Sequence, residues 1–171
     1  MSRNIELKAR LPDPVAARRV AEQICGEAEI QRQTDTYFHC AHGRLKLREI
    51  EGVGAQLIWY DRPDKAEPRG SDYLLTPVME PAALRKALAM ALGVRGVVRK
   101  NRRIYLSRNV RIHLDEVEGV GSFLEFEAVL DEQTDDAAGR RQVDELRLQF
   151  GIAVDDLLTG SYGDMLVRPE P

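Results

Sequence analysis

The sequence predicts an α+β domain dominated by β-structure, in which about eight antiparallel strands close into a barrel. Segments in which apolar and polar residues alternate recur along the chain, as expected for half-buried strands. Most of these segments are joined by short turns, which connect antiparallel neighbours. A sheet of about eight twisted strands tends to curl, and closure removes its exposed edges. With 171 residues, 43% of them apolar, the chain can form one domain over 1–171 with a substantial core.

The first half of the chain is expected to hold five strands and one helix. Apolar and polar residues alternate strictly over 4–10, which predicts the first strand. Asp13 can then cap a helix that has Pro14 in its first turn, and we expect this helix at 15–24. The following strands are predicted at 30–38, 44–50, 55–61 and 72–78, with a polar, proline-bearing loop over 63–70.

The second half begins with a helix over 80–92, because Pro81 suits its first turn and Gly93 suits its end. Gly119 and Gly121 indicate a hairpin turn between two later strands. Three strands are predicted at 97–107, 110–117 and 122–130. The chain then finishes with a helix over 136–150, a short helix over 155–158 and a tail.

Several predicted strands place charged residues together on one face. Residues two apart in a strand point the same way, so Arg44, Lys46 and Arg48 share a face opposite the leucines between them. The same spacing groups Glu6 with Lys8, Lys100 with Arg102, Arg111 with His113 and Asp115, and Glu125 with Glu127.

These charged faces have two interpretations. The commoner one is the solvated outer face of a half-buried strand. Against it, like charges on one short face repel each other, arginine suits bidentate binding of phosphate oxygens, and paired carboxylates can hold a hard cation such as Mg²⁺. If the faces point into a barrel, the charges are too costly to bury alone. A polyanion with its divalent metal would neutralise both sets.

The order of these motifs resembles the CYTH superfamily, whose members include the class IV adenylate cyclases and the thiamine triphosphatases. The segment Asn4-Ile5-Glu6-Leu7-Lys8 is similar to the Glu-x-Glu-x-Lys signature near the N-terminus of the family. The similarity continues, in the family's order, through DTYF at 35–38, GRLKLR at 43–48, YDRP at 60–63, Lys100-x-Arg102, RIHLDEVEG at 111–119, GSFLEFE at 121–127 and SY at 161–162.

The resemblance implies an eight-stranded antiparallel barrel, known in the family as a triphosphate tunnel, with flanking helices. It implies that a basic wall holds phosphate oxygens through Lys8, Arg44, Lys46, Arg48, Lys100, Arg102 and Arg111, with Arg62 as an addition to that wall. It also implies that Mg²⁺ or Mn²⁺ binds to Glu6, Glu125 and Glu127, helped by Asp115. Glu6, Lys8, Glu125 and Glu127 are the residues expected to act in catalysis.

One residue departs from the family pattern. Asn4 stands where the signature has its first Glu. An amide oxygen can bind a metal but carries no charge, so any second metal site is expected to be weaker. His113 is expected to face the mouth of the tunnel or to hydrogen-bond locally.

Three functions are compatible with these residues. The first is a class IV adenylate cyclase, which converts ATP to cyclic AMP and pyrophosphate. The second is a triphosphatase acting on thiamine triphosphate, a nucleoside triphosphate or inorganic tripolyphosphate. The third is a non-catalytic binder of polyphosphate or nucleotides, which the missing carboxylate at Asn4 favours.

Charge and cysteine content narrow the class of partner and the compartment. A net charge of −3 argues against a broad basic surface for binding duplex DNA, so no nucleic-acid partner is expected. The resemblance to the CYTH superfamily implies that the partner is a small molecule that bears a triphosphate. No apolar segment is long enough to predict a membrane span.

Cys25 and Cys40 have no metal-ligand spacing and suggest free thiols in the cytoplasm. Cys40 and its neighbouring histidines are poorly spaced for zinc. A homodimer is compatible with the resemblance.

Overall fold

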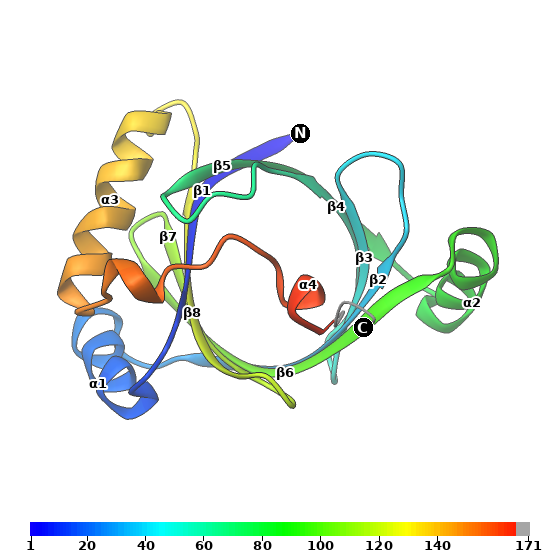
Figure 1. The fold of residues 1–171 in the computed structure, drawn as a ribbon, viewed down its shortest axis with the longest axis horizontal. Helices are drawn as coiled ribbons and strands as arrows, with labels where there is room; N and C mark the ends of the chain where they lie inside the picture. The colour runs from blue at the N-terminus through cyan, green and yellow to red at the C-terminus, as the bar shows by residue number, and fades with distance from the viewer. Residues whose placement is uncertain (167–171) are drawn as a thin grey trace.

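The eight strands form a closed barrel in a computed structural model, which describes residues 1–166 (Figure 1). Around the barrel the order is β1-β5-β4-β3-β2-β6-β7-β8, and every neighbouring pair is antiparallel. The strands are β1 (Ser2–Arg10), β2 (Glu29–Phe38), β3 (Arg44–Ile50), β4 (Gly54–Asp61), β5 (Arg69–Val78), β6 (Val94–Ser107), β7 (Val110–Val117) and β8 (Gly121–Val129). The predicted fold class is confirmed.

Helices lie on two sides of the barrel and at its interior. In Figure 1, α1 and α3 flank β1, β7 and β8, α2 lies on the opposite side, and α4 lies inside the outline of the ring. The helices are α1 (Pro14–Cys25), α2 (Pro81–Leu92), α3 (Asp136–Gln149), the 3₁₀ helix η1 (Val154–Asp156) and α4 (Tyr162–Leu166). The predicted cap of α1 is present, because the Asp13 carboxylate accepts hydrogen bonds from the backbone N–H groups of Val15 and Ala16.

Element bounds differ from the sequence prediction by up to three residues, as at β6, which starts at Val94, and at the short helix, which is η1. Two differences change the region around the barrel interior. The predicted loop over 63–70 ends earlier, because Arg69 and Gly70 already pair with β1 opposite Glu6 and Ile5. The predicted tail contains α4, a helix of 5 residues. Neither segment carries an alternating or helical apolar pattern, so the barrel contacts decide both structures. Residues 167–171, part of the predicted tail, lie outside the described residues.

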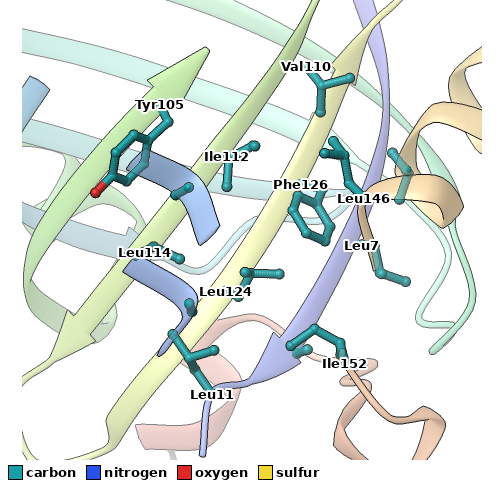
Figure 2. Packing of buried hydrophobic residues seen from close by; sticks show 14 of the residues in the cluster. Leu7, Leu11, Tyr105, Val110, Ile112, Leu114, Leu124, Phe126, Leu146 and Ile152 are labelled. Atoms are coloured by element: carbon teal, nitrogen blue, oxygen red, sulfur yellow. The ribbon is translucent and has the colours of Figure 1, made fainter. Parts of the chain in front are cut away.

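The main apolar core lies between the outer face of the barrel and the helices. Figure 2 shows Leu7 of β1, Ile112 of β7 and Phe126 of β8 packed with Leu146 of α3. A second apolar cluster joins β2, β3 and β4 to α2. Side chains alternate along a strand, so packing the apolar faces outward beneath the helices turns the charged faces inward.

The C-terminal segment enters the barrel where β1 finishes. The backbone N–H of Leu158 donates to the Lys8 carbonyl at 2.8 Å, and Leu157 bridges to Ala9. The ring of Tyr162 in α4 packs on Phe123, with ring centroids 4.9 Å apart. A small apolar cluster at this end comprises Tyr37, Val98, Val117, Phe123 and Tyr162. The segment therefore forms part of the interior wall.

The expected compartment, assembly and domain extent stay predictions. No helix among residues 1–166 is both long and apolar enough to cross a membrane. Cys25 and Cys40 are free thiols, one half-buried and the other exposed.

Candidate functional site

The inward faces of the strands line one cavity with an empty volume of about 790 Å³, open solvent included. Most of the predicted site residues are on its wall, namely Glu6, Lys8, Lys46, Arg48, Arg62, Lys100, Arg102, Arg111, Glu125 and Glu127. Arg44 and Asp115 do not line the cavity. Asp115 contacts Tyr162, which does line it, and Arg44 contacts Asp164, two residues after Tyr162. The structure therefore brings together charges that come from most of the strands.

One buried carboxylate organises part of the basic wall. Asp35 of β2 is fully buried and accepts hydrogen bonds from Lys46 Nζ at 3.1 Å and from Lys100 Nζ at 2.8 Å. Arg48 donates to both of its oxygens, from Nε at 2.8 Å and from Nη2 at 2.9 Å. Asp35 lies opposite Arg48 in the β2–β3 register, so strand pairing itself sets this contact. A single carboxylate of β2 thus fixes three basic side chains from β3 and β6, the strands on either side of it.

Burial and neighbouring charges change the ionisation of this cluster. Burial alone would raise the pKa of Asp35, but the charges of Arg48, Lys100 and Lys46 outweigh it and hold the pKa well below its usual range. Burial lowers the pKa of Lys46 to about 8, and the nearby Arg48 adds to this shift. Burial also lowers the pKa of Lys100 well below its usual range. Both amines are therefore easier to deprotonate than an exposed lysine.

Glu125 and Glu127 of β8 form an acidic wall. Glu125 lies 3.2 Å from Lys8 Nζ and accepts a hydrogen bond from Arg102 Nη2 at 2.9 Å. Burial would raise the pKa of Glu125, but the charges of Lys8 and Arg102 hold it well below the usual range, so this carboxyl is ionised. Glu127 lies 3.5 Å from Arg111 Nη1. Both carboxylates line the cavity, and carboxylate oxygens are ligands that divalent cations prefer.

Glu6 is held between two guanidinium groups. Arg62 Nε lies 2.9 Å and Arg69 Nη2 lies 3.1 Å from its Oε1 atom. Glu6 pairs with Glu127 in the β1–β8 register, so it lies beside the acidic wall. Burial raises the pKa of Glu6, although Arg62 opposes the shift. The oxygen that carries both contacts is thus already engaged.

Asp115, which is buried behind the cavity wall, is also engaged by its neighbours. Arg102 donates to both of its oxygens at 2.6 Å, and the Tyr162 hydroxyl donates to Oδ2 at 2.7 Å. Burial would raise the pKa of Asp115, but Arg102 lowers it to about 2. The ring of the same Tyr162 lies 3.9 Å from Lys8 Nζ. Asp115 therefore orients Arg102 and Tyr162 in this structure.

Arg44 lies at the edge of the site. Its Nη2 atom is 2.7 Å from Asp64 and 3.6 Å from Asp164, which follows Tyr162 in α4. Asp164 also accepts a hydrogen bond from Arg95 at 2.6 Å. Arg44 thus connects β3 to the C-terminal segment, and its predicted contact with phosphate stays a prediction.

Sequence reasoning gave no site role to four residues that the structure places there. Asp35 could have been found as a lone acid among inward-facing basic positions, and Tyr162 from its place in the family motif. Arg69 gave no signal, because it stands in a polar stretch that reads as a loop. His113 shares the inward face of Arg111, and its Nδ1 atom lies 3.5 Å from Glu125 Oε2 and 3.9 Å from Glu127 Oε1.

Comparison with solved structures finds the same fold. A protein from Pyrococcus horikoshii OT3 is 25% identical, with a TM-score of 0.84, and the match covers 94% of this chain and 98% of that one. A protein from Vibrio parahaemolyticus, described as "a putative adenylate cyclase", is 25% identical with a TM-score of 0.77. That match covers 96% of this chain and 98% of the other.

A more distant structure shares the fold alone. It comes from Hippeastrum and is described as a "putative adenylyl cyclase" with a dominant triphosphatase activity. It is 16% identical, with a TM-score of 0.66, and the match covers 98% of this chain and 94% of that one. No curated protein matches this chain. The model of the CYTH domain matches residues 2–162, nearly the whole length. Together with the barrel and its charged interior, this match establishes that the chain belongs to the CYTH family.

Proposed function

We propose that the protein is a divalent-metal-dependent enzyme that acts on a triphosphate compound bound inside the barrel. One observation carries the proposal. Basic side chains and the two carboxylates of Glu125 and Glu127 line the same cavity inside the barrel. A triphosphate and a divalent cation together complement these two walls, whereas either one alone leaves the other wall uncompensated. Membership of the CYTH family supports the same class of substrate.

The basic wall binds and orients the phosphate chain. Arg48 and Arg102 present planar guanidinium groups that suit two phosphate oxygens at once, whereas Lys46 and Lys100 act as point charges. Asp35 fixes three of these four groups before substrate arrives, which lowers the cost of ordering them. Groups held in this way stabilise the negative charge that develops on the leaving phosphate.

The residues present fit a divalent metal at the acidic wall. Glu125 and Glu127 offer carboxylate oxygens, the donors that Mg²⁺ and Mn²⁺ prefer. A bound ion would polarise a phosphoryl oxygen and lower the barrier to nucleophilic attack. The metal-ligand roles of Glu6 and Asp115 stay predictions, and both carboxylates make guanidinium contacts in this structure.

The reaction that we propose first is cyclisation of ATP. The ribose 3′ oxygen attacks the α-phosphorus, the bond between the α-phosphorus and its bridging oxygen breaks, and the 3′ proton is lost, giving cyclic AMP and pyrophosphate. The likeness to the 25%-identical Vibrio parahaemolyticus protein supports this choice. Tyr60, Tyr73 and Leu75 also line the cavity, and their apolar surface suits the base of a nucleotide. The expected compartment for such an enzyme is the cytoplasm.

Hydrolysis of a triphosphate by water is the alternative, because the same walls would serve it. A third alternative is a binder without turnover. The buried Oδ1 atom of Asn4 makes no hydrogen bond among the described residues, and no charge replaces the carboxylate of the family signature there.

Product analysis separates these alternatives. Purified full-length protein would be incubated with Mg²⁺ or Mn²⁺ and, separately, ATP, thiamine triphosphate and tripolyphosphate, and the products followed by ³¹P NMR. Cyclic AMP with pyrophosphate supports cyclisation, and orthophosphate supports hydrolysis. Binding without product would leave only the binder.

The acidic wall provides the matched variants for this experiment. We expect Glu125→Gln with Glu127→Gln to lower turnover about 100-fold or more, because the metal loses both charged ligands. Glu132→Gln, which changes an exposed carboxylate away from the cavity, should leave turnover unchanged. Full activity in the double variant would contradict the assignment of the metal to this wall.

A further inference from the structure

His113 lies beside the carboxylate pair and has no assigned role. It pairs with Glu125 in the β7–β8 register, and Glu127 is the next inward-facing residue on β8. One ligand atom from each of these three residues lies within 4.8 Å of the other two. Metal ions bind nitrogen and oxygen at about 2.0–2.3 Å, so two ligands of one ion lie at most about 4.6 Å apart. The spacing of these three atoms is close to that limit. The three side chains therefore surround a volume that suits a single cation.

The Nδ1 atom of His113 is buried and unsatisfied. The residue is 3% exposed, and Nδ1 makes no hydrogen bond within residues 1–166. Its separation of 3.5 Å from Glu125 Oε2 is not accompanied by hydrogen-bond geometry. Buried polar atoms almost always have a partner, so an orphaned nitrogen aimed at two carboxylates points to a ligand between them.

We infer that His113 Nδ1 is the third ligand of a divalent cation held by Glu125 and Glu127. The inference rests on the proposed function only for the claim that a metal binds at this wall. Cations surround the same carboxylates, because Lys8 and Arg102 contact Glu125 and Arg111 contacts Glu127. A carboxylate oxygen has more than one lone pair, so Glu125 can keep its Arg102 contact and still ligate the ion.

A nitrogen ligand changes which metal the site prefers. Mg²⁺ selects oxygen ligands and keeps much of its water, whereas imidazole suits transition ions. The site therefore prefers Mn²⁺ to Mg²⁺. The imidazole also adds a third protein ligand in a chain whose Asn4 lacks the carboxylate of the family signature.

Electron paramagnetic resonance of bound Mn²⁺ tests this directly, on full-length protein without nucleotide. Loss of the free Mn²⁺ signal measures binding, and electron spin echo modulation detects a coordinated imidazole nitrogen. The chain has three histidines, and His39 and His42 are exposed, so the double variant His39→Gln with His42→Gln leaves His113 alone. This double variant, with ¹⁵N-labelled histidine, should retain Mn²⁺ binding and show ¹⁵N in place of ¹⁴N coupling.

The variant His113→Gln should lose the nitrogen coupling and bind Mn²⁺ about tenfold or more weakly, with a smaller change in Mg²⁺ affinity. Bound Mn²⁺ without a histidine coupling in the labelled double variant would overturn the inference while leaving the metal site intact. No Mn²⁺ binding by the unmodified protein would overturn both this inference and the metal assignment. The labelled double variant decides the question even if His113→Gln does not fold.

Discussion

Asp35 shows how one residue can prepare a binding wall. Its carboxylate is fully buried and contacts three cations, Lys46, Arg48 and Lys100. One negative charge cannot balance all three, so the cluster keeps an excess of positive charge beside the cavity. Buried positive charge is costly without a partner, and an incoming polyanion supplies one. The protein thus holds in place, before any ligand binds, the groups that we propose to bind phosphate.

The lowered pKa of Lys46 predicts a pH dependence of binding. The pKa is about 8 in the folded protein, so a growing fraction of the amine is neutral above that pH. Tripolyphosphate should therefore bind more weakly as the pH rises from about 7 to about 9.5. The same residue has the opposite effect on stability. The unfolded chain keeps this proton up to about pH 10.4, so the unfolded state binds more protons in that window and the ligand-free protein gains stability as pH rises.

Isothermal titration calorimetry across this pH range measures the effect, with Lys46→Arg as the matched variant. A guanidinium stays protonated, so Lys46→Arg should show a shallower fall in affinity. Ionisation of tripolyphosphate is common to both proteins and cancels in the comparison. Parallel curves for the two proteins would mean that Lys46 does not titrate in this range.

At the scale of elements, the approach of α3 to the barrel depends on Gly139. A Cβ atom at this position would lie 2.8 Å from Leu130 Cδ2 and 2.9 Å from Ile5 Cγ1. Gly139 lies on the buried face of α3, one turn before Val143, which is also buried. These distances are too short for real contacts, so glycine here sets the distance between α3 and β1.

Gly139→Ala should destabilise the protein by about 1–3 kcal/mol through overpacking, despite a gain of about 1 kcal/mol in helix propensity. Urea unfolding measures the change. Ala137→Gly, at an exposed position in the first turn of the same helix, serves as the control and should cost at most about 1 kcal/mol from propensity alone. Greater stability of Gly139→Ala than of the natural chain would show that α3 can move away from the sheet.

The elements differ in how far the sequence could predict them. The strands and the first three helices were predictable because alternation, proline starts and glycine ends are local signals. The helix α4 could not be predicted from the sequence, because a segment of 5 residues forms a helix only with the help of contacts to the barrel. One such contact joins Tyr162 to Asp115. The start of β5 at Arg69 was missed for the same reason, since its partners are Glu6 and the carbonyl of Leu158.

At the scale of the whole molecule, the barrel places its apolar core outside and its charges inside. Alternation along a strand is the same for either orientation, so the strands taken singly could not decide which face points inward. The resemblance to the CYTH family selected the correct orientation, and the packing of α1, α2 and α3 on the outer face explains it. The pairing of individual charged side chains, such as Arg102 with Asp115, depends on register and barrel closure and was beyond local sequence patterns.

A crystal structure with tripolyphosphate and Mn²⁺ tests the central claim most directly. Anomalous scattering would locate the metal, and electron density would locate the phosphates. We predict phosphate oxygens against Lys46, Arg48, Lys100 and Arg102, with Mn²⁺ at Glu125 and Glu127. Tripolyphosphate and Mn²⁺ bound on the outer surface, with the charged interior free of both, would contradict the account.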